Sequence, residues 1–226
     1  MARTRFNIYR YAHKSLRLLL AELIERAGRT DFRDQHELGR LREDTALSLR
    51  LVRAHARHEA TFLGPLLQLY CPELGTKVME DHASHEALLD GLWTLLVSTD
   101  PHRADASLRG QEFNLLLSRC AGELLIHMSE EEQLVLPALW QKVSDKTLQT
   151  VSESLLANMA QGDQVVWLKS MLRALNRRER VTLLARMRAT LAEATFVAIV
   201  DSVRAELQSV HGSVISDLRL LESSAA

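Results

Sequence analysis

Apolar residues recur along this chain at spacings of three and four positions, which is the repeat of an amphipathic helix. Leu and Ala fill many of these positions, while β-branched residues seldom form the runs that are typical of strands. Only four prolines interrupt the pattern. The sequence therefore predicts an all-α protein.

The longest periodic segments predict four helices that form an up-down four-helix bundle. The first should end at Gly28, because glycine favours the conformation that closes a helix. Residues 71–75 separate the second helix from the third, and the turn-rich residues 98–102 separate the third from the fourth. Pro65 and Pro137 should disturb the second and fourth helices. The expected ranges are about 7–27, 34–70, 76–97 and 105–143.

Shorter amphipathic pieces follow the predicted bundle. Ser144 resembles a helix start, and breaks are expected near Gly162, Asn176 and Thr190, which gives three or four more helices. Two uses stay open for this C-terminal helical extension, packing on the bundle or forming a homodimer surface. The predicted domains are the bundle, residues 1–143, and the extension, residues 144–226.

Each bundle helix carries histidine on the stripe that should face the core. Two helices add a glutamate one turn later, although an unpaired buried carboxylate is costly. Such a pattern predicts a buried polar site. The expected stripes are Phe6, Tyr9, His13, Leu16, Leu20 and Leu23; Val52, His55, Glu59, Phe62 and Leu66; Val78, His82, His85, Leu89, Leu92 and Leu96; and Phe113, Leu117, Cys120, Leu124, His127, Glu131, Leu134 and Ala138.

A His-x-x-x-Glu unit occurs twice, at His55–Glu59 and at His127–Glu131. Residues four apart project from the same side of a helix, so each unit can offer an imidazole and a carboxylate to a metal in the bundle axis. A proline follows each histidine by ten residues, and His13 and His82 each precede one unit. The sequence thus resembles a duplicated helical hairpin with four imidazoles and two carboxylates.

Nitrogen and oxygen donors in these numbers suit two bridged iron or manganese ions, and the nitrogen ligands favour iron. Ligand type alone leaves copper and zinc open. Cys71 and Cys120 are the only cysteines and form no C-x-x-C pair, so a cysteine-only metal site is excluded.

The combined motifs resemble the hemerythrin-like, HHE cation-binding family over residues 1–143. The matching segments are Tyr11 to Arg17, His55-x-x-x-Glu59, Asp81-His82 and His127-x-x-x-Glu131-Glu132 with Pro137. The resemblance implies a non-haem di-iron centre, with Glu59 and Glu131 as bridges and an open position for dioxygen, nitric oxide or peroxide. It implies four terminal ligands, His13, His55, His82 and His127.

Oxygen-storing hemerythrins differ from this pattern in two helices. They resemble a five-histidine pattern with His-x-x-x-His on the third helix, where this chain has Glu86 in place of the second histidine. On the fourth helix that pattern has His-x-x-x-x-Asp, where this chain has His-x-x-x-Glu. The chain is more similar to di-iron proteins linked to nitrosative stress. Three functions stay open: a binding or sensing protein in a stress response, a redox enzyme acting on peroxide, nitric oxide or ferrous iron, and an iron donor or store.

Several polar residues lie near the expected ligands without joining them. His85 shares a stripe with His82 and could be a fifth ligand, but we favour a hydrogen-bonding neighbour of the ligands. Glu86, Glu130 and Glu132 are assigned to the solvated face or the surroundings of the site. No role is assigned to three other histidines, His36, His102 and His211.

Charge and composition narrow the setting. Twenty-eight basic and twenty-nine acidic residues give a formal charge of −1, which carries no electrostatic signature of nucleic-acid or membrane-surface binding. The first twenty residues are charged throughout and lack the apolar core of a secretory signal. We therefore expect a cytoplasmic protein with no nucleic-acid or membrane partner.

Overall fold

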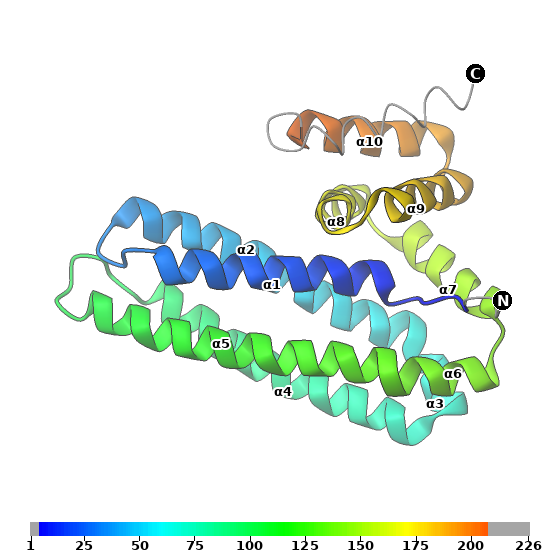
Figure 1. The fold of residues 1–226 in the computed structure, drawn as a ribbon, viewed down its shortest axis with the longest axis horizontal. Helices are drawn as coiled ribbons and strands as arrows, with labels where there is room; N and C mark the ends of the chain where they lie inside the picture. Colours follow the sequence, from blue (N-terminus) through cyan, green and yellow to red (C-terminus); the bar gives the residue numbers. More distant parts are fainter. Residues whose placement is uncertain (1–4, 208–226) are drawn as a thin grey trace. The chain divides into compact units, whose positions relative to one another are not determined.

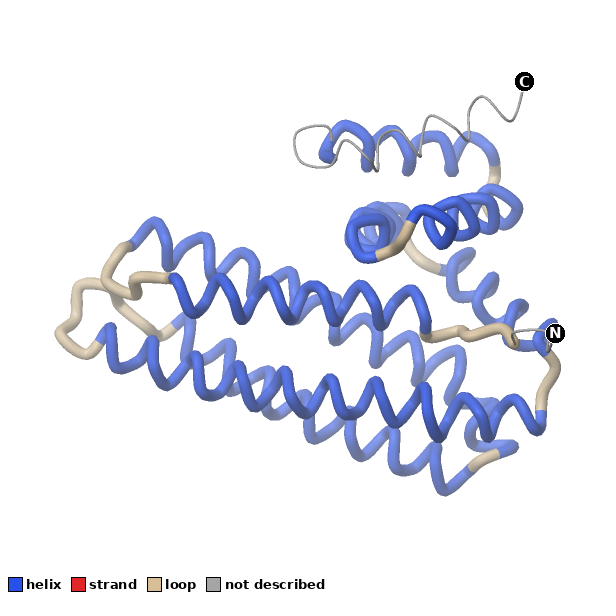
Figure 2. Tube along the Cα trace, in the orientation of Figure 1, coloured by secondary structure: helices blue, strands red, loops and turns tan. Residues whose placement is uncertain are grey.

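The computed structural model describes residues 5–207, and the regular structure in this range is entirely helical (Figures 1 and 2). The predicted all-α class is confirmed. Elements labelled η are π-helical turns, which are wider than α-helical ones. In chain order the elements are α1 (Arg10–Arg29), α2 (Gln35–His58), η1 (Glu59–Leu63), α3 (Gly64–Tyr70), α4 (Pro72–Val97), α5 (Ala106–Glu130), η2 (Glu131–Val135), α6 (Leu136–Lys142), α7 (Asp145–Asn158), α8 (Gln161–Ala174), α9 (Arg177–Thr190) and α10 (Glu193–Leu207).

Residue contacts divide the chain into two compact units. Of the described residues, the long-helix unit comprises 16–143, and the short-helix unit comprises 5–15 together with 144–207. The boundary falls inside α1, which is one continuous helix. The first turns of α1 therefore share a unit with the C-terminal helices. The division into domains 1–143 and 144–226 stays a prediction.

In the long-helix unit, α1, α2, α4 and α5 run alongside one another, each opposite in direction to the one before it (Figure 1). α4 packs against both α2 and α5. The apolar stripes face the interior, where Leu16, Leu41, Leu92 and Phe113 are buried. Within residues 5–207, no helix combines the length and the apolar composition that crossing a membrane requires.

Helix boundaries follow local capping chemistry. α2 begins directly after Asp34, whose carboxylate accepts hydrogen bonds from two backbone N–H groups of the first turn. α4 begins at Pro72 instead of near residue 76, because proline needs no hydrogen-bond acceptor in the first turn. Gly75 lies inside this helix, where an added Cβ would come 3.2 Å from Cβ of Leu67. Close packing therefore explains this glycine better than the predicted break.

α1 and α8 also begin at other residues than the sequence predicts. α1 begins at Arg10 because Asn7 is its cap: Oδ1 of Asn7 accepts hydrogen bonds from the N–H groups of Tyr9 and Arg10 at 2.9 and 3.0 Å. α7 ends at Asn158 and α8 begins at Gln161, so this break precedes the predicted one at Gly162.

The π-helical turns η1 and η2 interrupt the second and fourth long helices at matching points. In η1 the N–H of Gly64 bonds the carbonyl of Glu59, and in η2 the N–H of Leu136 bonds the carbonyl of Glu131. A proline comes next in both cases. Proline lacks an N–H and crowds the preceding turn, which a wider turn accommodates. The predicted disturbances are thus confirmed, and each begins at a glutamate.

Each π-helical turn moves the buried face by one position. Val135 and Leu139 are buried, whereas Leu134, which the α-helical register places in the core, is 50% exposed. The extra residue in the turn causes this shift, so the predicted stripe beyond Glu131 was wrong. In the same way, Leu63 and Leu67 are buried in place of Phe62 and Leu66.

The short-helix unit has its own apolar core, made by α8, α9 and α10. Its N-terminal segment is tied to these helices by polar contacts. Nζ of Lys14 lies 2.6 Å from Oε2 of Glu179, and the hydroxyls of Ser15 and Ser170 are 2.6 Å apart. The buried core residues are Leu168, Leu172, Leu184, Met187, Phe196, Ile199, Val200 and Val203. His211 lies outside the described residues.

Candidate metal site

The six predicted ligands come from separate helical elements. Each glutamate is the first residue of a π-helical turn, and its partner histidine lies four residues earlier, near the end of the preceding α-helix. Their places are His13 on α1, His55 on α2, Glu59 on η1, His82 on α4, His127 on α5 and Glu131 on η2.

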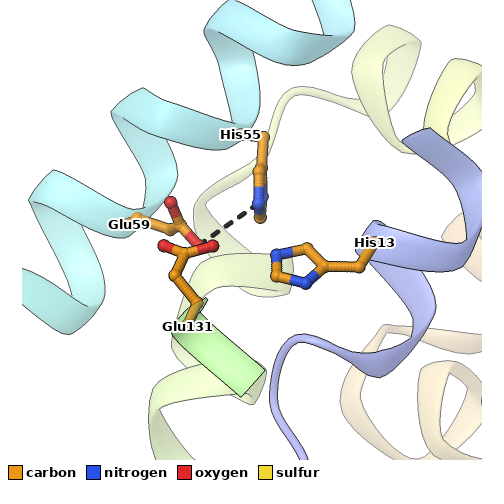
Figure 3. Close-up of side chains that lie close together, drawn as sticks. All are labelled: His13, His55, Glu59 and Glu131. Atoms are coloured by element: carbon orange, nitrogen blue, oxygen red, sulfur yellow. Dashed lines mark ion pairs between the residues drawn. The ribbon is translucent and has the colours of Figure 1, made fainter. Parts of the chain in front are cut away.

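These six side chains form two overlapping groups of potential metal ligands. Within each group, one donor atom per residue lies within 4.8 Å of every other. Figure 3 shows the first group, in which the carboxyl groups of the two glutamates lie close to the rings of His13 and His55. Glu59 and Glu131 belong to both groups. The groups are His13, His55, Glu59 and Glu131, and Glu59, His82, His127 and Glu131.

The two oxygens of Glu59 face different histidines. Oε1 lies 3.2 Å from Nε2 of His55, and Oε2 lies 3.1 Å from Nε2 of His82. On the other helix, Oε1 of Glu131 lies 3.4 Å from Nε2 of His127. The Nε2 atoms of His82 and His127 are 3.0 Å apart. The carboxylate of Glu59 therefore lies between His55 and His82, with one oxygen near each imidazole.

Burial makes the two carboxylates unfavourable as bare anions. Glu59 is 7% exposed and Glu131 is 1% exposed. Burial, the negative charge of Glu131 and a hydrogen bond with Glu131 together raise the pKa of Glu59 well above its ordinary value. A positive charge at this place would remove the penalty.

The histidines of the second group differ in basicity. Burial, followed by the neighbouring His127, lowers the pKa of His82 to about 4, so its imidazole is neutral at pH 7. Burial also lowers the pKa of His127. Hydrogen bonds with Glu131 and Asp81 and the negative charges of both carboxylates outweigh burial, so the pKa of His127 is raised overall. Neutral imidazole is the form that binds metals.

The donor set fits divalent cations. Two buried carboxylates need compensating positive charge, and a neutral imidazole beside them offers a lone pair. Because both carboxylates are shared, the two groups together could hold two ions, one at each pair of histidines. The ligands for such ions would be the six residues that the sequence predicts.

The sequence analysis did not predict that Asp81 and Lys77 form a series of polar contacts leading to Nδ1 of His127. Nδ1 of His127 lies 3.3 Å from Oδ2 of Asp81, and Nζ of Lys77 lies 2.8 Å from the same oxygen. Lys77 also contacts Glu130 at 2.5 Å. A carboxylate behind a histidine fixes the ring and its tautomer. The Lys-x-x-x-Asp spacing, directly before His82, is the sequence feature that could have indicated the contact of Lys77 with Asp81.

A small cavity lies beside the second group of ligands. Its volume is about 30 Å³, which is enough to hold a water molecule. His55, His82, His85 and His127 line it together with mainly apolar side chains. The ring centroids of His85 and His127 are 5.0 Å apart. Neither group of potential ligands found within residues 5–207 includes His85, and its predicted role as a neighbour stays a prediction.

Other residues near the site have structural contacts. Cys120 is 2% exposed, and burial raises the pKa of its thiol to about 11, which agrees with an apolar filler. Glu86 pairs with Arg53, and Glu132 pairs with Arg17. The ring of Tyr9 stacks on His13 with centroids 4.9 Å apart.

Comparison with known proteins assigns no family to the chain. A scan against models of protein families finds no match, and searches of curated proteins and of solved structures find none either. What stands is an all-helical protein with a buried histidine–glutamate cluster that could bind metal.

Proposed function

We propose that this protein is a hemerythrin-like, non-haem di-iron protein that binds a small ligand. Glu59 and Glu131 bridge two iron ions in this proposal. His13 and His55 complete the ligands of one ion, and His82 and His127 complete those of the other. The observation that carries the proposal is that the two donor groups share the same two carboxylates.

Two further observations support iron and a bundle of the hemerythrin type. Imidazole and carboxylate ligands suit non-haem iron, and carboxylate-bridged pairs of ions occur in the cores of four-helix bundles. Here α1, α2, α4 and α5 alternate in direction (Figure 1), and the donor residues lie on these helices and on η1 and η2. The duplicated His-x-x-x-Glu units agree with the resemblance found in the sequence.

The ligand would be small, such as dioxygen, nitric oxide or peroxide. An iron pair would supply coordination positions for it and could exchange electrons with it. The cavity beside the cluster, about 30 Å³ in volume, limits what can approach. The carboxylate of Asp81 orients the ring of His127. The role in sensing or stress response is proposed from the resemblance of the ligand pattern to di-iron proteins linked to nitrosative stress.

The test is metal analysis with an optical spectrum before and after dithionite. We expect about two irons per chain and near-ultraviolet charge-transfer bands that bleach on reduction. Protein that stays folded but cannot be loaded with iron would overturn the proposal. Reversible, stoichiometric binding of nitric oxide supports a sensor, whereas sustained turnover of peroxide would instead assign an enzyme.

A further inference from the structure

Arg53 on α2 lines two separate spaces of the long-helix unit. One is the small cavity beside His55, His82, His85 and His127. The other is an outer pocket of about 350 Å³. A single side chain therefore lies between the histidine–glutamate cluster and a much larger surface pocket.

The outer pocket is rich in arginine. Arg50, Arg53 and Arg57 come from one face of α2, because they are three and four residues apart. Trp93 of α4 contributes an aromatic wall. Guanidinium groups bind oxyanions and other small anions, and several on one wall raise the local anion concentration. The remaining lining residues are Ala46 and Leu49.

Arg53, the residue that the two linings share, forms ion pairs with two carboxylates of α4. Nε of Arg53 lies 2.7 Å from Oε1 of Glu86, and Nη2 of Arg53 lies 2.5 Å from Oδ1 of Asp90. Glu86 also lines the inner cavity, where it is the one exposed residue of the lining. The side chain of Glu86 is 52% exposed and that of Asp90 is 68% exposed. Water therefore reaches this part of the wall.

Moving Arg53 away from these partners should cost little. Ion pairs of solvent-exposed carboxylates contribute little to stability, because water replaces much of the lost attraction. By contrast, Leu89, Leu124 and Met128 elsewhere in the cavity wall are buried. Their displacement would disturb the packed core.

We propose that the outer pocket binds small monovalent inorganic anions, and that these anions reach the cluster past Arg53. The pocket collects the anion, and movement of Arg53 from Glu86 and Asp90 opens the way to the inner cavity. The second step rests on the proposed function, because it needs bound metal as the destination. The first step does not depend on metal.

The metal-free full-length chain tests the pocket, with iodide and neutral acrylamide as quenchers. The fluorescence of Trp93 is taken as the difference between wild type and Trp93→Phe. Iodide should quench it more strongly than acrylamide does. In Arg50→Gln/Arg57→Gln the iodide effect should fall about twofold or more, while acrylamide quenching stays unchanged. Arg103→Gln/Arg119→Gln removes two arginines that do not line the pocket and should leave the iodide quenching of Trp93 unchanged. Equal iodide quenching in all three proteins overturns the anion site.

The iron-loaded chain tests the route, with azide as the anion and nitric oxide as a neutral probe in stopped-flow absorbance. Arg50→Gln/Arg57→Gln should slow azide association severalfold and leave nitric oxide association unchanged. Arg53→Met should speed nitric oxide association at equal iron content. Unchanged rates in both variants overturn the route. A chain that binds no iron instead overturns the proposed function, and the iodide result still decides the pocket.

Discussion

Glu59 and His82, which lie on η1 and α4, approach each other through Oε2 and Nε2 at 3.1 Å, while the second oxygen of Glu59 faces His55 at 3.2 Å. Glu59 thus links two sets of histidines from its position in the core. The same residue is unfavourable as an anion in metal-free protein, because burial and Glu131 raise its pKa. Function and stability should therefore oppose each other at this residue.

Glu59→Gln should stabilise the metal-free protein and weaken metal binding. The pKa of folded Glu59 is raised, so its contribution to stability is present below pH 4.5 and is lost as pH rises through the raised value. At pH 8, we expect metal-free Glu59→Gln to be more stable than wild type by about 1–3 kcal/mol, with a smaller difference at pH 5. Urea unfolding at both pH values measures this.

Glu123→Gln is the control for Glu59→Gln. This glutamate pairs with Arg119 on the surface of α5, so its loss should change stability by less than about 0.5 kcal/mol. A Glu59→Gln variant that is less stable than wild type without metal would show that the carboxylate is not penalised.

Asp81→Asn should weaken metal binding by about 10–100-fold. Asp81 contacts Nδ1 of His127 and belongs to neither donor group found in residues 5–207, so the change removes the carboxylate that orients the ring. Competition with a chelator of known affinity measures the effect. Asp90 lies on α4 like Asp81, but it contacts Arg53 of α2, so Asp90→Asn should keep wild-type affinity. Equal affinities in the two variants would argue against a positioning role for Asp81.

Gly110 and Gly122 on α5 should respond oppositely to alanine. An added Cβ at Gly110 would lie 2.5 Å from Cδ2 of Phe32, a buried ring, whereas Gly122 has no atom within 4 Å of that position. We expect Gly110→Ala to cost about 1–3 kcal/mol and Gly122→Ala to add about 0.5–1 kcal/mol. Thermal unfolding compares them. A neutral Gly110→Ala would mean that Phe32 can move aside.

Glu179 should make the short-helix unit sensitive to acid. Burial raises the pKa of this carboxyl, but hydrogen bonds from Lys14 and the backbone of Asn176, with the charges of Lys14 and Arg10, outweigh burial and lower it. Its contribution is therefore present above pH 4.5 and lost as pH falls through the lowered value. Glu179→Gln should lose about 1 kcal/mol at pH 7 and show less change below pH 4.5.

The fluorescence of buried Trp167, in a background with Trp93→Phe and Trp140→Phe, reports on the unfolding of this unit. Glu153→Gln changes an exposed residue of α7 and serves as the control. Parallel pH profiles for Glu179→Gln and the control would rule out this contribution of Glu179.

The candidate site could be predicted because its chemistry is periodic. Residues four apart share a helix face, so His55 with Glu59 and His127 with Glu131 stand out against an apolar stripe. The repeated prolines also indicated the disturbed turns. The same periodicity failed beyond each glutamate, because a π-helical turn changes the register and places Val135 in the core instead of Leu134.

Contacts between distant segments left no such pattern. Lys14 meets Glu179, and Ser15 meets Ser170, although more than 150 residues separate each pair. No local spacing indicates that the start of α1 belongs with α8 and α9. The contact of Asp81 with His127, 46 residues away, likewise follows from the fold and from no local spacing.

The most direct test of the two-ion site is the iron content of a set of variants after anaerobic loading and gel filtration. We expect about two irons in wild type, fewer in His55→Ala and in His82→Ala, and none in Glu59→Ala/Glu131→Ala, because that pair is shared by both groups. Circular dichroism checks that each variant is folded. A folded Glu59→Ala/Glu131→Ala protein that keeps about two irons would contradict the account.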